Sequence, residues 1–111
     1  MTFTQHESCG KCVPCREGTR QMLEMLTDIT EGNGTEETLA LLAEAGNAVK
    51  LTSLCGLGKS APSPVLSTLR YFKDEYLAHV NAKYCPTRSC KALTPITIDA
   101  GLCKGCTLCK R

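Results

Sequence analysis

Apolar residues recur at helical spacing in three segments of the first 81 residues. In the first segment, which follows Cys15 and ends at the glycines of EGNGT, they occupy positions i, i+3, i+4 and i+7. The second segment opens with Thr35 as a candidate N-cap, has acidic residues in its first turn, and should end close to Cys55. The apolar positions of these two predicted helices are Met22, Met25, Leu26 and Ile29, then Leu39, Leu42, Ala43 and Val49.

The third segment has the clearest helical periodicity. In SAPSPVL, Ser63 can cap a helix and Pro64 suits its first position, where no backbone N–H is needed. The stripe that follows covers one face of a single predicted helix. It consists of Val65, Leu69, Phe72, Tyr76 and Val80. Three amphipathic helices predict an all-α fold.

Beyond Asn81 the helical periodicity stops. The remaining sequence, KYCPTRSCKALTPITIDAGLCKGCTLCKR, contains prolines, a short β-branched stretch and five cysteines. We therefore expect a helical domain over residues 1–82 and an irregular, cysteine-rich appendage over residues 83–111.

Composition excludes several function classes. A length of 111 residues allows one domain with an appendage. The formal charge is +2, and the basic residues are scattered without interleaved aromatics, so no nucleic-acid partner is expected. No apolar run approaches the roughly 20 residues of a membrane span, and MTFTQHES lacks a signal-peptide core. We expect a cytoplasmic chain without membrane insertion.

The cysteines indicate metal or cluster chemistry. There are nine, an odd number, and many fall in C-x-x-C runs, which argues against a disulfide framework. Three of them, Cys9, Cys12 and Cys15, lie at three-residue spacing directly before the first helix and lack a fourth donor. Cys55 is the best candidate, because it lies at a helix end and is followed by glycines that let backbone approach a bulky group.

Four thiolates suit either an iron–sulfur cluster or a zinc ion. Zinc modules usually supply their ligands as two pairs, whereas a cysteine triplet with one remote cysteine is typical of a cubane [4Fe-4S] cluster. The spacing favours the cluster, with Lys11, Arg16 and Lys59 as solvated charges nearby that offset its negative charge.

FTQHESCGKCVPCREGT, followed some forty residues later by SLCGLG, resembles the C-terminal cluster domain of the flavin- and NADH-binding subunit of respiratory complex I. SLCGLGKSAPSPVLSTLRYFKDEYLAHV is most similar to the beta subunits of NAD(P)-linked, electron-bifurcating hydrogenases or formate dehydrogenases. The resemblance implies a four-helix bundle whose [4Fe-4S] cluster receives electrons from a flavin. The implied ligands are Cys9, Cys12, Cys15 and Cys55, and the implied partners are other subunits of a flavin and iron–sulfur oxidoreductase complex.

The resemblance also implies a ferredoxin-like extension. CKGCTLCKR supplies Cys103, Cys106 and Cys109 of a ferredoxin run without its fourth cysteine, so we expect a truncated segment of a longer parent. No glycine-rich dinucleotide fingerprint is present. FMN and NAD(P) are therefore expected only in a missing upstream domain, and no catalysis is expected from this chain alone.

A third set of candidate ligands comprises His79, Cys85 and Cys90. A neutral imidazole with these thiolates, and with Cys103 as a further ligand, is a reasonable zinc shell. The alternative is that His79 complements the dipole of a helix end and that the two thiols are free. Two function classes thus stay open: an electron-relay module and a structural zinc-binding interaction domain with no redox role.

Overall fold

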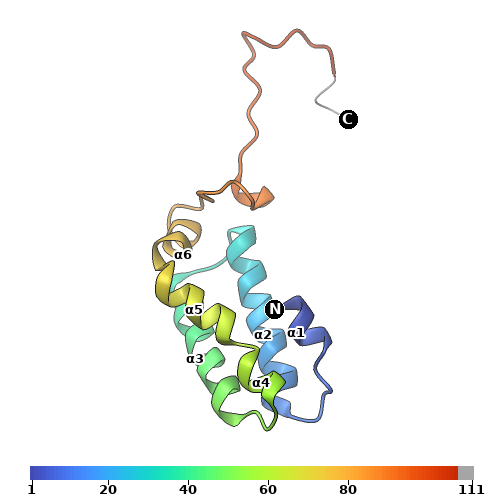
Figure 1. Cartoon of the computed structure of the whole chain (residues 1–111). Coiled ribbons are helices and arrows are strands. Elements are labelled where there is room, and N and C mark those ends of the chain that lie inside the picture. The colour runs from blue at the N-terminus through green and yellow to red at the C-terminus, as the bar shows by residue number, and fades with distance from the viewer. Residues whose placement is uncertain (108–111) are drawn as a thin grey trace.

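The computed structural model describes residues 1–107, and within these residues it contains helices and irregular segments but no strand. The prediction of an all-α fold is confirmed. The elements, shown in Figure 1, are α1 (Thr2–His6), α2 (Val13–Glu31), α3 (Glu36–Thr52), α4 (Gly56–Ser60), α5 (Ser63–Tyr71), α6 (Lys73–Val80) and the short 3-10 helix η1 (Lys91–Leu93).

The α2–α3 hairpin is the centre of the fold, and its turn follows the sequence signals. Gly32 ends α2 in the left-handed region with φ 88°, which a residue with a side chain rarely adopts. Thr35 caps α3 through a capping box, because its side chain accepts from the Thr38 N–H while the Thr38 hydroxyl accepts from the Thr35 N–H. Both predicted boundaries are confirmed.

Helices α5 and α6 pack on this hairpin and complete a small four-helix bundle. Two glycines allow the close approach of helices. A Cβ at Gly18 of α2 would lie 2.2 Å from Cγ2 of Val49, and one at Gly46 would lie 2.9 Å from Cδ2 of Leu66. The buried core consists of Met22, Ile29, Leu39, Leu42, Val49, Val65 and Val80.

The prediction of one continuous third helix is wrong. The chain leaves helical geometry at Phe72, with φ −124° and ψ 36°, so that α5 ends there and α6 begins at the next residue. Phe72 is 54% exposed, although the predicted stripe placed it in the core. The break allows the Tyr76 hydroxyl to reach the Thr68 hydroxyl at 2.9 Å. The cap of α5 also differs: Pro62, one residue before Ser63, occupies the N-cap position.

The segment after α6 first packs on the bundle and then leaves it. Asn81 donates to the Glu36 carboxylate at 2.8 Å, and the Lys83 ammonium donates to the Gly34 carbonyl at 2.7 Å. Leu93 in η1 is buried. Residues 95–107 then extend away from the helices (Figure 1). No helix of the described residues is long and apolar enough to cross a membrane.

Candidate metal centres

The cysteine triplet lies at the start of α2. Cys9 is exposed in the preceding loop, Cys12 is the N-cap residue, and Cys15 is buried in the first turn. Gly10 has φ 75°, and its carbonyl accepts a hydrogen bond from the Arg16 guanidinium. This bond folds the loop back over the first turn of the helix, so the three cysteines stay on one short, curved stretch of chain.

The fourth candidate, Cys55, lies at the same end of the bundle, directly before α4. It is the N-cap residue of this short helix. A Cβ added at Gly58 would lie 2.5 Å from the Cβ of Ser53 and 3.3 Å from the Cβ of Cys15. The missing side chain at position 58 thus lets α4 lie directly against Cys15. Gly56, by contrast, has no such neighbour within 4 Å.

The polar groups at this end are suited to anionic sulfur. Backbone N–H groups of Gly58 and then Leu57 donate to the Cys55 thiol and lower its pKa, with a smaller contribution from the charge of Lys59. The Ser8 hydroxyl is hydrogen-bonded to Sγ of Cys15 at 3.4 Å. Iron–sulfur clusters are held by thiolates, and their potentials depend on hydrogen bonds to sulfur, so this donor set fits such a cluster.

Among residues 1–107, the group of metal-binding side chains that converges lies away from these four cysteines. Within residues 1–107, one group of three His, Cys, Asp or Glu side chains has all its ligand atoms within 4.8 Å of one another, and it includes none of the four cysteines. A zinc ion needs thiolate sulfurs at about 2.3 Å, and therefore close to each other, whereas a cluster is larger and accepts a wider ring of thiolates.

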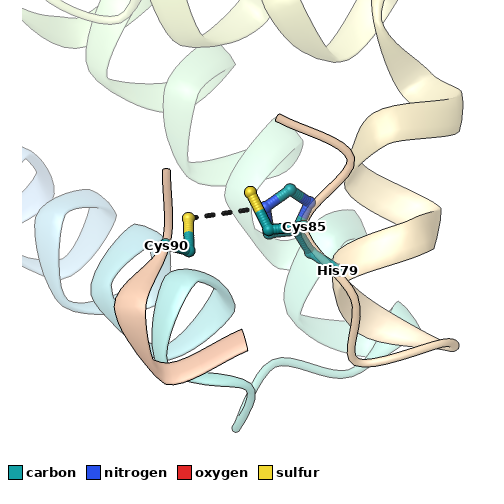
Figure 2. Close-up of side chains that lie close together, drawn as sticks. All are labelled: His79, Cys85 and Cys90. Carbon is teal, nitrogen blue, oxygen red and sulfur yellow. Dashed lines mark hydrogen bonds between the residues drawn. The ribbon is translucent and has the colours of Figure 1, made fainter. Parts of the chain in front are cut away.

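The group that does converge is His79, Cys85 and Cys90 (Figure 2). His79 comes from the last turn of α6, Cys85 from the loop after it, and Cys90 from the residue before η1. Cys85 is 1% exposed. The loop between the cysteines includes Arg88 at φ 55°, in the left-handed region. The third candidate set of the sequence is thus brought together.

The protonation pattern of this group leaves ligand atoms available. Nδ1 of His79 lies 2.7 Å from the Glu75 carbonyl, which can only accept, so Nδ1 carries a proton and Nε2 of the neutral imidazole is the atom that can accept from the Cys90 thiol or bind a metal. Cys90 Sγ is 3.5 Å from Nε2. A hydrogen bond from Thr87 and backbone N–H groups lower the pKa of Cys85 to about 6, whereas burial and the neighbouring Cys85 raise that of Cys90. At neutral pH the pair therefore holds one thiolate and one thiol.

The cysteines of the tail do not join either group in the described residues. Cys103 and Cys106 are exposed in the segment that extends from the bundle, and Cys109 lies outside the described residues. Sequence reasoning missed the two serines at the first centre, Ser8 and Ser53. Ser8 directly precedes Cys9, and Ser53 lies two residues before Cys55; this proximity to candidate ligands could have identified them.

Comparison with known proteins assigns the chain to a family. A model of the NADH-ubiquinone oxidoreductase-F iron-sulfur binding region matches residues 1–79. The chain belongs to this family. The resemblance noted in the sequence and the prediction of an iron–sulfur cofactor are confirmed by this membership.

Relatives of this iron–sulfur region occur in larger proteins. The chain is 48% identical over 111 residues to the NADP-reducing hydrogenase subunit HndC of Solidesulfovibrio fructosivorans, covering all of this chain and 23% of the relative. It is 44% identical over 84 residues to the F subunit of the NADH-quinone oxidoreductase of Streptomyces coelicolor, covering 76% of this chain and 19% of the relative. The mitochondrial 51 kDa subunit of the NADH-ubiquinone oxidoreductase of Aspergillus niger is 34% identical over 79 residues, 71% of this chain and 16% of the relative. The chain thus spans less than a quarter of each relative.

Proposed function

We propose that Cys9, Cys12, Cys15 and Cys55 bind one [4Fe-4S] cluster and that the chain relays single electrons from a flavin to further iron–sulfur centres. The observation that supports the proposal is the contact of α4 with Cys15 at Gly58, because Cys55 is the N-cap residue of this helix.

The protein residues have separate tasks in this proposal. The cluster, when bound, accepts and donates one electron at a time. The four thiolates hold it, and the backbone N–H groups that lower the pKa of Cys55 favour the thiolate needed for ligation. Burial of Cys15 shields one side of the site, whereas exposed Cys9 and Cys55 leave the other side open to a partner.

The partners follow from the names of the relatives. These are subunits of a hydrogenase and of NADH-quinone oxidoreductases, so we propose that the chain works with other subunits of a flavin and iron–sulfur complex. FMN and NAD(P) would bind in other parts of that complex. A nicotinamide delivers two electrons as hydride, so a flavin must convert them into single-electron steps before this domain is reached.

Substitution of the fourth ligand tests the cluster assignment. After anaerobic reconstitution, the unchanged chain should hold about four iron atoms at this site, and Cys55→Ala should lose most of them together with the EPR signal of the reduced cluster. Cys90→Ala, at the other end of the bundle, is the matched control and should keep the signal. Full iron content and an unchanged EPR signal in Cys55→Ala would show that Cys55 is not a ligand.

The relay is tested by the choice of reductant. The reconstituted chain should not bleach with NADH alone, but should bleach with dithionite or with a reduced flavoprotein domain. Rapid stoichiometric reduction by NADH without a flavoprotein would contradict the relay. A colourless chain that takes up zinc in place of iron and sulfide at the four cysteines would support the alternative, a structural zinc domain.

The tail is a separate question, and the division at residue 82 stays a prediction. We propose that Cys103, Cys106 and Cys109 hold no stable cluster within this chain. Deletion of residues 103–111 should then leave the iron content of the reconstituted protein unchanged, whereas a fall to half would show a second cluster in the tail.

His79, Cys85 and Cys90 converge at a second candidate site, and we propose that this site binds zinc. Zinc prefers imidazole nitrogen and thiolate sulfur, and the three ligand atoms already lie within 4.8 Å. Cys103 is the fourth ligand suggested by the sequence. Binding would displace the thiol proton of Cys90, so metal uptake should release protons.

Cobalt substitution tests this second site. Co²⁺ added to a chain in which Cys9, Cys12, Cys15 and Cys55 are replaced by serine should give sulfur-to-cobalt charge-transfer absorbance that His79→Ala weakens strongly. The control His6→Ala removes an exposed imidazole at the other end of the sequence and should leave the spectrum unchanged. Equal spectra for the two histidine variants would contradict the assignment, and Cys103→Ala reports whether the tail supplies the fourth ligand.

A further inference from the structure

Ser53 carries an unexplained polar group at the cysteine end of the bundle. It is the C-cap residue of α3, two positions before Cys55, and is 3% exposed. Among residues 1–107, its hydroxyl is the one buried side-chain oxygen or nitrogen with no hydrogen-bond partner. A buried hydroxyl without a partner loses its bonds to water with no replacement, so native proteins rarely keep one unless something beyond the polypeptide pairs with it.

The surroundings of the hydroxyl show where that partner would lie. A Cβ added at Gly58 would be 2.6 Å from Oγ of Ser53 and 3.3 Å from Cβ of Cys15. The same point on α4 thus touches both the serine hydroxyl and a candidate cluster ligand. Ser53 and Cys15 thus pack against the same residue of α4, so the hydroxyl lies at the cysteine end of the bundle.

The other hydroxyls around Cys15 are already paired. Thr19, also buried, donates to the Cys15 carbonyl at 2.6 Å, which is an ordinary helix contact. Ser8 is hydrogen-bonded to Sγ of Cys15 at 3.4 Å and accepts from the Gly10 N–H. Ser53 differs from both, because no backbone carbonyl or thiol of the described residues takes its proton.

We propose that the Ser53 hydroxyl donates a hydrogen bond to a sulfur atom of the bound cluster and thereby raises its reduction potential. The inference rests on the proposed cluster function. A donor to sulfur stabilises the reduced state more than the oxidised state, because the reduced state carries one more negative charge, and hydrogen bonds to sulfur are a recognised determinant of cluster potentials.

Redox titration of the reconstituted full chain tests the proposal. At the midpoint potential of the unchanged protein, Ser53→Ala should lower the ratio of reduced to oxidised cluster about two- to tenfold, or roughly 20–60 mV for one electron. Ser67→Ala is the matched control, since it removes an exposed hydroxyl of α5 that bonds only to the Pro64 carbonyl. It should leave the ratio unchanged.

Two further measurements separate this role from a purely structural one. In D2O, the exchangeable-deuteron coupling in the pulsed EPR spectrum of the reduced cluster should lose one contribution in Ser53→Ala, while the contributions of the Ser8 hydroxyl and the backbone N–H groups remain. In the cluster-free chain, Ser53→Ala should melt at the same temperature or higher, because it removes an unpaired buried group. Ser53→Gly provides a second hydroxyl-free variant if the alanine protein does not fold.

The outcomes distinguish the two proposals. If the unchanged chain takes up no iron and sulfide, both fail. If it binds the cluster but Ser53→Ala and Ser53→Gly keep the potential and every contribution to the deuteron coupling, the inference about Ser53 fails while the cluster assignment stands.

Discussion

Gly58→Ala is the sharpest test of how the cysteine end is built. The added Cβ would lie 2.5 Å from Cβ and 2.6 Å from Oγ of Ser53. These are the first atoms of a short side chain, so rotation cannot remove the clash and the backbone of α3 or α4 must move. The packing of α4 against α3 thus requires glycine at position 58.

The effect of Gly58→Ala on the free energy of unfolding is the sum of two opposing contributions. Overpacking of a tight interior typically costs about 1–3 kcal/mol. Replacing glycine by alanine within a helix contributes about 0.5–1 kcal/mol in the stabilising direction. The net destabilisation should be about 0–2.5 kcal/mol, and the difference from a glycine-to-alanine change without the clash should be about 1–3 kcal/mol, or roughly 4–15 °C in melting temperature for a domain of this size.

Gly56→Ala is the matched control, because it makes the same substitution in the same helix where no atom lies within 4 Å of the new methyl group. Both variants are compared by thermal unfolding of the cluster-free chain, followed by circular dichroism, and by iron content after reconstitution. Gly58→Ala should melt lower and hold less iron, since movement of α4 carries Cys55 away from Cys15. Equal melting temperatures for the two variants would refute the packing argument.

Three other predictions concern the rest of the bundle. Gly18→Ala places a Cβ 2.2 Å from Cγ2 of Val49 and should lower the free energy of unfolding in urea by about 1–3 kcal/mol. In the Gly18→Ala chain, Val49→Ala should be less destabilising than it is in the unchanged chain, and costs that simply add would contradict the contact. Thr35→Ala removes the capping box of α3 and should cost about 1 kcal/mol, whereas Thr27→Ala, on the exposed face of α2, should cost less. The pKa of Cys85 is lowered from its ordinary value of 9.0 to about 6 in the folded chain. The contribution of Cys85 to the stability of the metal-free protein should therefore be complete above pH 9.0 and be lost as the pH drops to about 6, and a Cys85→Ser chain with the same slope over this range would contradict this.

The end of α2 and the start of α3 could be predicted from sequence because their signals are local, whereas α2 begins at Val13, before the expected start after Cys15. Gly32 supplies the left-handed residue that ends one helix, and Thr35 supplies the side chain that caps the next. The periodicity between these signals also gave the core residues of the hairpin, and Met22 and Leu42 are both fully buried. No long-range information was needed for this part.

The break at Phe72 could not be predicted in this way, because its stabilising contact is tertiary. The hydroxyl of Tyr76 lies 2.9 Å from that of Thr68 across the break, a side-chain contact that the apolar periodicity does not contain. An apolar stripe at helical spacing predicts which residues could share one helix face. It does not predict whether these residues form one helix or two shorter helices.

The sequence named His79, Cys85 and Cys90 as candidate ligands from their residue types, but it could not show that their side chains converge. The reversal after α6 uses Lys83 at φ 49° and Arg88 at φ 55°, where sequence-based turn rules expect glycine or asparagine. The Lys83 ammonium offsets this unfavourable backbone by bonding to the Gly34 carbonyl, 49 residues earlier in the chain. Long-range contacts of this kind are not visible in local spacing.

The two centres lie at opposite ends of α2 and differ in the way expected for different ligands. Cys15 is in the first turn of this 19-residue helix, and η1, which follows Cys90, packs near its last turn, so the helix alone separates them by about 25–28 Å. At the first end, hydroxyl and backbone N–H donors lie beside the sulfur atoms of Cys15 and Cys55, which favours an anionic cluster. At the second end, one imidazole and two sulfurs converge within 4.8 Å, which favours a single ion. Because the donor sets share no residue, loss of iron in Cys55→Ala and loss of cobalt absorbance in His79→Ala should occur independently, and a defect at one end should not spread along the helix to the other.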